Sequence, residues 1–127
     1  MKMLAVALCV ATSSICVGCM TQQAYDGPKR PSDEVAHISG DLRVTAGAPL
    51  SVLLRKVDEY TLSVGESGVD VLPGKHTLLA DCLIRETSST TRQSIDVEVG
   101  AGQHYKLVAE TGPGLRECTS ISLELRD

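Results

Sequence analysis

Hydrophobic and polar residues alternate along most of the chain after residue 33, in short runs separated by Gly, Pro, Asp or Ser. The runs recur about every 8–12 residues, a spacing typical of an all-β sandwich or barrel. Outside the N-terminal leader no segment keeps the i, i+3, i+4 apolar spacing of an amphipathic helix, so we expect helices to be minor. The pattern predicts a small antiparallel β-sandwich of about seven strands within residues 34–127.

The predicted strands end at turn residues, among which Pro73-Gly74 is the strongest stop. Their ranges are Glu34–Ser39, Leu50–Val57, Tyr60–Val64, Val69–Leu72, Lys75–Arg85, a run through Ile95, Val97 and Val99, Gln103–Thr111 and Thr119–Arg126. Because side chains alternate between the two faces of a strand, each range predicts one inward set. In Lys75–Arg85 this set is His76, Leu78, Ala80, Cys82 and Ile84.

Two further expectations follow from the same alternation. The polar residues Ser88–Thr91 are expected to form a loop. In the last strand Ile121, Leu123 and Leu125 are expected to point inward, which places Cys118 off that parity.

The first 18 residues have the layout of a signal peptide. A short basic start at Met1–Met3 precedes the run Leu4–Val17, which is too short for a bilayer span of about 20 residues. Ile15-Cys16-Val17-Gly18-Cys19 then resembles the lipobox of bacterial lipoproteins, although Cys16 stands where that family prefers Leu. Ordinary signal cleavage at the small residues Cys16 and Gly18 is the alternative.

The lipobox resemblance implies cleavage between Gly18 and Cys19 and acylation of Cys19 with chains such as palmitate. Two or three acyl chains anchor a protein stably, since each buried methylene contributes about 0.8 kcal/mol. Met20 follows the cysteine in place of the Asp that retains members of the family in the inner membrane. The resemblance therefore implies the outer membrane, facing the periplasm or the cell surface, in a host with two membranes.

Residues 19–33 are predicted to be the lipidated N-terminus and a flexible tether. The segment Thr21–Asp33 is polar and holds two prolines, a composition that favours an extended chain over a packed element. Fully stretched it would span about 45 Å, enough to lift the domain clear of the lipid headgroups.

Cleavage leaves Cys19, Cys82 and Cys118, and with Cys19 acylated Cys82 and Cys118 form an even pair in an exported, oxidising setting, which favours a disulfide. Two buried free thiols are the alternative. A zinc site is less favoured, since His76, His104 and the two thiols lack a recognisable ligand spacing.

Composition narrows the function classes. The chain of 127 residues has a formal net charge of −4 and no basic run, which argues against nucleic-acid binding. Lys29-Arg30 is expected to be solvated surface. With no Trp or Phe and three Tyr, the chain also lacks rings for stacking sugars or bases.

Catalytic chemistry is not predicted. His37, His76 and His104 lie on three different predicted strands, and no Ser or Cys occupies a nucleophile-elbow or protease setting. We expect no enzyme activity, no cofactor and no metal site. A hydrolase would require a His beside a Ser or an Asp in one cleft.

The segment Val69–Leu78 resembles the strand, Pro-Gly, strand core of PEGA-like and carboxypeptidase-regulatory-like β-sandwich domains, and Val97–Tyr105 resembles a later turn of such domains. These domains bind, space or stabilise. The expected function is therefore a lipid-anchored, non-enzymatic envelope protein that contacts a protein partner, for instance as an accessory subunit. The alternative is a binding module for a small ligand or envelope polymer, or an enzyme inhibitor, with a polar patch near Ser88–Thr91 and His104.

Overall fold

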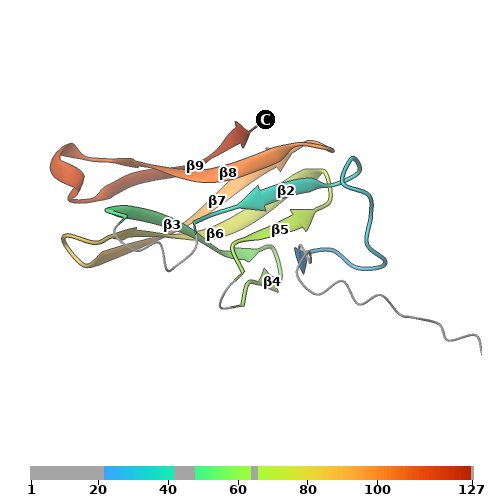
Figure 1. Cartoon of the computed structure of the whole chain (residues 1–127), viewed down its shortest axis with the longest axis horizontal. Coiled ribbons are helices and arrows are strands. Elements are labelled where there is room, and N and C mark those ends of the chain that lie inside the picture. Colours follow the sequence, from blue (N-terminus) through green and yellow to red (C-terminus); the bar gives the residue numbers. More distant parts are fainter. Residues whose placement is uncertain (1–21, 42–47, 64–65, 127) are drawn as a thin grey trace, which may run out of the picture.

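The computed structural model describes residues 22–41, 48–63 and 66–126, and these form two packed β-sheets (Figure 1). The strands are β1 (Gln22–Gln23), β2 (Ala36–Ser39), β3 (Leu50–Val57), β4 (Tyr60–Thr61), β5 (Gly68–Val71), β6 (Gly74–Ile84), β7 (Ser89–Val99), β8 (His104–Thr111) and β9 (Cys118–Arg126). Helical structure in these ranges is the three-residue 3-10 helix η1 (Pro113–Leu115), and no described helix is long and apolar enough to cross a membrane.

One sheet has the strand order β1-β5-β2-β8-β9 and the other the order β4-β3-β6-β7. Neighbouring strands are antiparallel except for two pairs, β1 with β5 and β2 with β8. The predicted all-β sandwich is confirmed. Among the nine strands of the described ranges, β1 and β4 have only two residues each.

The core lies between the sheets and is built from aliphatic side chains. Its largest fully buried members are Ile38, Leu78, Leu107, Val57, Val69, Val71 and Cys82. Burying one aliphatic side chain of this size contributes about 1.5–3 kcal/mol. The predicted inward set of β6 is confirmed for Leu78, Ala80, Cys82 and Ile84, all of which are buried, whereas its fifth member, His76, is half-buried.

Two β-bulges reset the alternation of faces. In β3 the pairing with β6 skips Arg55, so Leu54 and Val57 both reach the core. In β9 the pairing with β8 skips Thr119, because Glu110 lies opposite Ser120 and Thr111 opposite Cys118. A period of two does not foresee such an insertion.

Two expectations about β9 are wrong, and the bulge at Thr119 accounts for the first. Cys118 is the first residue of this strand and is buried with Ile121, although the uninterrupted alternation put it off the inward parity. Leu125, expected to point into the core, is 54% exposed near the free end of the strand.

Cys82 and Cys118 join the two sheets through a disulfide. Cys82 lies in β6 and Cys118 in β9, their Cα atoms are 6.5 Å apart, and 36 positions separate them in the chain. A second link lies nearby, where the side-chain oxygen of Gln93 in β7 accepts a hydrogen bond of 3.2 Å from the backbone of Ile121. The disulfide thus ties the edge strand β9 to β6, and the hydrogen bond ties it to the edge strand β7.

The expected loop at Ser88–Thr91 is wrong, because β7 begins at Ser89 and Ile84 pairs with Ser89 across the β6–β7 hairpin. Threonine favours strands. Ser89, Thr91 and Gln93 alternate as half-buried positions with exposed neighbours, so the strand pattern continues through this polar stretch.

The N-terminal segment differs from the expected tether. β1 pairs in parallel with β5, with Gln22 opposite Val69 and Gln23 opposite Asp70, and the next backbone amide, of Ala24, donates to Asp70 O at 2.8 Å. The chain is thus held against the sandwich from Gln22 onward, and the described part of residues 19–33 is not a free spacer.

Candidate functional site

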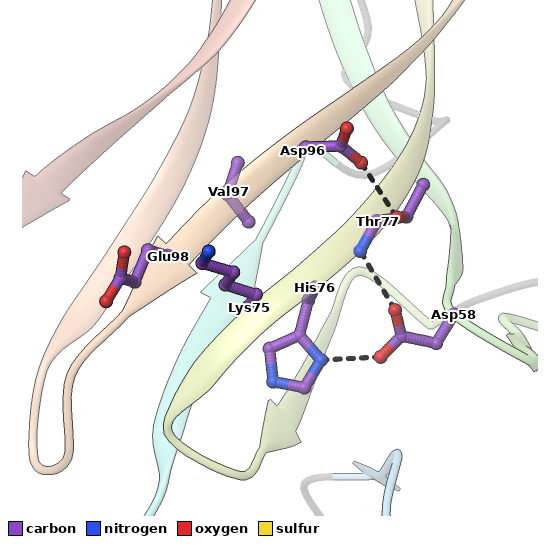
Figure 2. A pocket seen from close by; sticks show the side chains of 7 residues that line it. All are labelled: Asp58, Lys75, His76, Thr77, Asp96, Val97 and Glu98. Atoms are coloured by element: carbon purple, nitrogen blue, oxygen red, sulfur yellow. Dashed lines mark hydrogen bonds and ion pairs between the residues drawn. The ribbon is translucent and has the colours of Figure 1, made fainter.

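A surface pocket of about 520 Å³ opens at the start of β6, where β3, β6 and β7 run side by side (Figure 2). It is lined by Asp58, Lys75, His76, Thr77, Asp96, Val97 and Glu98. The register of β6 and β7 places Lys75 opposite Glu98 and Thr77 opposite Asp96. Asp58 reaches the pocket from the turn between β3 and β4, at a positive φ of 49° that Asp tolerates better than most residues.

Hydrogen bonds connect the polar groups of this pocket to one another. Asp58 accepts from the Thr77 backbone N–H at 2.9 Å through Oδ1, and its Oδ2 lies 2.5 Å from His76 Nδ1. The Thr77 hydroxyl donates to Asp96 Oδ1 at 2.8 Å. The side chains of Asp58, His76, Thr77 and Asp96 are therefore held by contacts within the pocket.

His76 has an oxygen acceptor at each ring nitrogen. Nδ1 faces Asp58, and Nε2 lies 2.5 Å from the carbonyl oxygen of Leu72. With both nitrogens engaged, His76 is not placed to accept a proton from a substrate.

Two opposing effects act on the Asp58 carboxylate. Partial burial works to raise its pKa, whereas the hydrogen bond from His76, the backbone hydrogen bond from Thr77 and the charge of His76 lower it. The net result is a pKa below the ordinary value of 3.8, so Asp58 is ionised at neutral pH.

A second, smaller pocket of about 270 Å³ lies on the outer face of the five-stranded sheet. Its lining residues are Lys29, Arg30, Ser32, Val35, His37, Asp70 and His104. His37 Nδ1 lies 3.0 Å from Asp70 Oδ1, and the ring centroids of His37 and His104 are 5.6 Å apart. Two of the three histidines that the sequence assigns to separate strands are therefore neighbours.

Sheet register accounts for this second cluster. His37 lies opposite Asp70 on β5 and opposite His104 on β8. Because Ala36 and Ile38 on either side of His37 are buried, the His37 side chain points to the outer face. The parallel pairing of β2 with β8, which no local pattern predicts, creates the cluster.

The His37–Asp70 pair meets part of the requirement for a hydrolase, since a His lies beside an Asp in one cleft. Ser32 lines the same pocket, yet among the described residues no hydrogen bond joins its hydroxyl to His37. A nucleophile–base contact is the step that activates serine. The arrangement is thus a His–Asp pair without an engaged nucleophile.

The structure separates the two parts of the polar patch expected near Ser88–Thr91 and His104. Ser88, Ser89 and Thr90 line a pocket at the β6–β7 turn, whereas His104 follows the opposite end of β7. The Ser88–Thr90 stretch and His104 therefore cannot form one site. Within residues 22–41, 48–63 and 66–126, no group of three His, Cys, Asp or Glu side chains is arranged to hold a metal ion.

Of the other predicted site residues, one pair lies outside the residues that the structure describes and the other pair lies within them. Gly18 and Cys19, the expected cleavage and lipidation positions, lie outside the described residues. Cys82 and Cys118, the expected disulfide pair, are bonded.

Sequence reasoning missed the interaction between Asp58 and His76 as well as the ion cluster around Asp81. Asp81 is on the outer face of β6 as expected, yet it is only 6% exposed. Arg92 donates to it at 2.8 and 3.1 Å, and Arg55 lies 3.5 Å away. In the β6–β7 hairpin Asp81 lies opposite Arg92. The length of the turn sets this register, so the turn length, had it been known, would have predicted the ion pair.

Comparison with known proteins gives no relative from which function could be transferred. No family model, no curated protein and no solved structure matches the chain.

Proposed function

We propose that this protein is a small lipid-anchored envelope lipoprotein, attached through Cys19, whose sandwich acts by contact with a protein partner and not by catalysis. The lipobox resemblance supports the anchor and, through Met20, a place in the outer membrane of a host with two membranes. The partner is a protein of the cell envelope, for which this chain would be an accessory subunit.

The observation that carries the proposal is the internal bonding of the pocket in Figure 2. Asp58, His76 and Thr77 are engaged with one another and with neighbouring backbone, so none is poised to attack or deprotonate a substrate. A surface whose side chains are already fixed loses little conformational entropy when it binds. Such a surface suits recognition.

Charge at the rim of this pocket supports the same proposal. Lys75 and Glu98 are exposed and lie opposite each other on β6 and β7, with Asp96 two positions away. Exposed charges of both signs favour specific docking of a complementary protein surface and suppress wrong partners.

In-cell crosslinking tests this proposal. A photo-crosslinking residue is placed at position 75 or 98 of the full-length protein in cells of the host, and a control carries it at exposed Arg116, beyond η1. We expect one defined crosslinked product from positions 75 and 98 and none from position 116. Recovery of monomer alone at every position, or the same products at all three, would contradict contact through this pocket.

The alternative function is a module that binds a small ligand or an envelope polymer, or that inhibits an enzyme. The His37–Asp70–His104 pocket favours it, because it is concave and gathers polar groups from the segment before β2 and from three strands. Purified protein that binds no partner but retains a ligand in this pocket would favour the alternative.

A further inference from the structure

The pocket around His37 collects positive charge on a chain that is acidic overall. Lys29 and Arg30 line it together with His37 and His104, against one carboxylate, that of Asp70. This carboxylate is already bonded to His37 at 3.0 Å. The pocket therefore presents two permanent cations and the free His104 ring to an incoming ligand.

Lys29 and Arg30 belong to a segment that the fold holds in place. Gln23 Nε2 donates to the carbonyl oxygens of Tyr25 at 3.1 Å and of Gly27 at 2.6 Å. The Arg30 backbone N–H donates to the Tyr25 hydroxyl at 2.9 Å. These bonds, together with the β1–β5 pairing, keep the basic doublet beside the sheet instead of on a free tether.

The donor set suits a phosphate group. Guanidinium binds phosphate oxygens through two parallel hydrogen bonds, ammonium supplies a point charge, and imidazole adds a further donor. Asp70 holds the His37 ring in position through Nδ1. A divalent metal ion is disfavoured here, because Lys29 and Arg30 would repel it.

The position of β1 relative to Cys19 indicates that lipid headgroups at the membrane surface are one source of such a phosphate. β1 begins at Gln22, three residues after Cys19, and three residues span at most about 11 Å. A lipid on Cys19 would therefore hold this edge of the sandwich at the membrane surface, in place of the separation of about 45 Å that a free tether would allow. Gln23 pairs with Asp70, so the pocket lies beside this edge.

We propose that the pocket formed by Lys29, Arg30, His37 and His104 binds a phosphate group, supplied by a lipid headgroup at the membrane surface or by a soluble phosphate compound. The headgroup source rests on the proposed anchor at Cys19, whereas phosphate binding itself does not. The inference deepens the alternative function by naming its ligand class. It is independent of partner contact through the pocket in Figure 2.

Histidine NMR signals report directly on this pocket. The full-length protein in a non-ionic detergent is titrated with inorganic phosphate in one arm and with dihexanoyl phosphatidylglycerol in the other, at constant ionic strength. His104→Ala and His37→Ala each assign the ring signal of the histidine that they remove, and His104→Ala also removes one donor. Lys29→Ala/Arg30→Ala removes both permanent cations, and Arg85→Ala/Arg116→Ala is the charge-matched control at two exposed sites outside the pocket.

We expect saturable shifts of both histidine signals, with a Kd raised about tenfold or more in Lys29→Ala/Arg30→Ala and unchanged in the control, since one hydrogen bond to a charged group contributes about this factor. Tighter binding of the lipid assigns the headgroup source, and tighter binding of inorganic phosphate assigns a soluble one. No saturable shift in either arm, or equal Kd values for the two double variants, would overturn the proposal. Neither result depends on crosslinking at position 75 or 98.

Discussion

Cys82 of β6 and Cys118 of β9 bridge the two sheets across the core, with their Cα atoms 6.5 Å apart. The bond closes a loop that contains the β6–β7 hairpin, β8 and η1. The disulfide is therefore a covalent link between two sheets that otherwise contact each other through side-chain packing and a few hydrogen bonds.

Loss of this disulfide is expected to destabilise the domain by about 3–4 kcal/mol, the loop-closure entropy of a loop of this length. Urea unfolding of the wild type with and without reductant measures the effect, and Cys82→Ala/Cys118→Ala is the control that should not respond to reductant. An unfolding midpoint of the wild type that reductant leaves unchanged would show that the bond does not constrain the unfolded chain.

Gly40 marks a close crossing of backbone between the two sheets. A Cβ at this position would lie 2.7 Å from both Leu54 N and Val52 O, which are backbone atoms that cannot move aside independently. Gly40→Ala is expected to cost about 1–3 kcal/mol, the range for overpacking. Gly100→Ala is the matched control, since its Cβ would meet only side-chain atoms at 3.5 and 3.7 Å, and comparable losses in the two variants would contradict this crossing.

The Asp58–His76 contact predicts how stability responds to acid. The pKa of Asp58 is below 3.8 in the folded state, so its ionised form stabilises the fold above the unfolded pKa, and this contribution is lost as the pH falls through the folded value. We expect wild type to be more stable than Asp58→Asn at about pH 5, with the difference shrinking between about pH 4 and 2.

Chemical denaturation of both proteins at each pH measures that difference. Asp96→Asn is the control, because Asp96 also accepts from Thr77 but does not contact His76. A difference between wild type and Asp58→Asn that is constant down to about pH 2 would show that the carboxylate is not stabilised by its neighbours.

Local alternation predicted the strands and the buried face of β6, because side-chain period and turn residues act over a few positions. It failed at Thr119, where one inserted residue reverses the parity and turns Cys118 inward. It also failed at Gln22–Gln23, which are polar and short and become a strand only because β5 has an open edge beside them.

The candidate sites were less predictable than the strands. Asp58 with His76, and His37 with Asp70 and His104, are joined by turn length and by sheet order. Both are properties of the assembled sheets and leave little trace in the local sequence. Cys82 and Cys118 could be paired only because they were the two cysteines left after the expected cleavage and the expected acylation of Cys19.

The proposed lipid anchor at Cys19 would set both the location of the protein and the distance from lipid to the pocket around His37, and the mass of the mature N-terminus tests this anchor. Mass spectrometry of protein isolated from host membranes should show a chain that begins at Cys19 and carries a diacylglycerol with or without an N-acyl chain. Cys19→Ser should abolish the added mass and release the protein from the membrane. A wild-type chain that begins elsewhere, or begins at Cys19 without lipid, would contradict the proposed anchor.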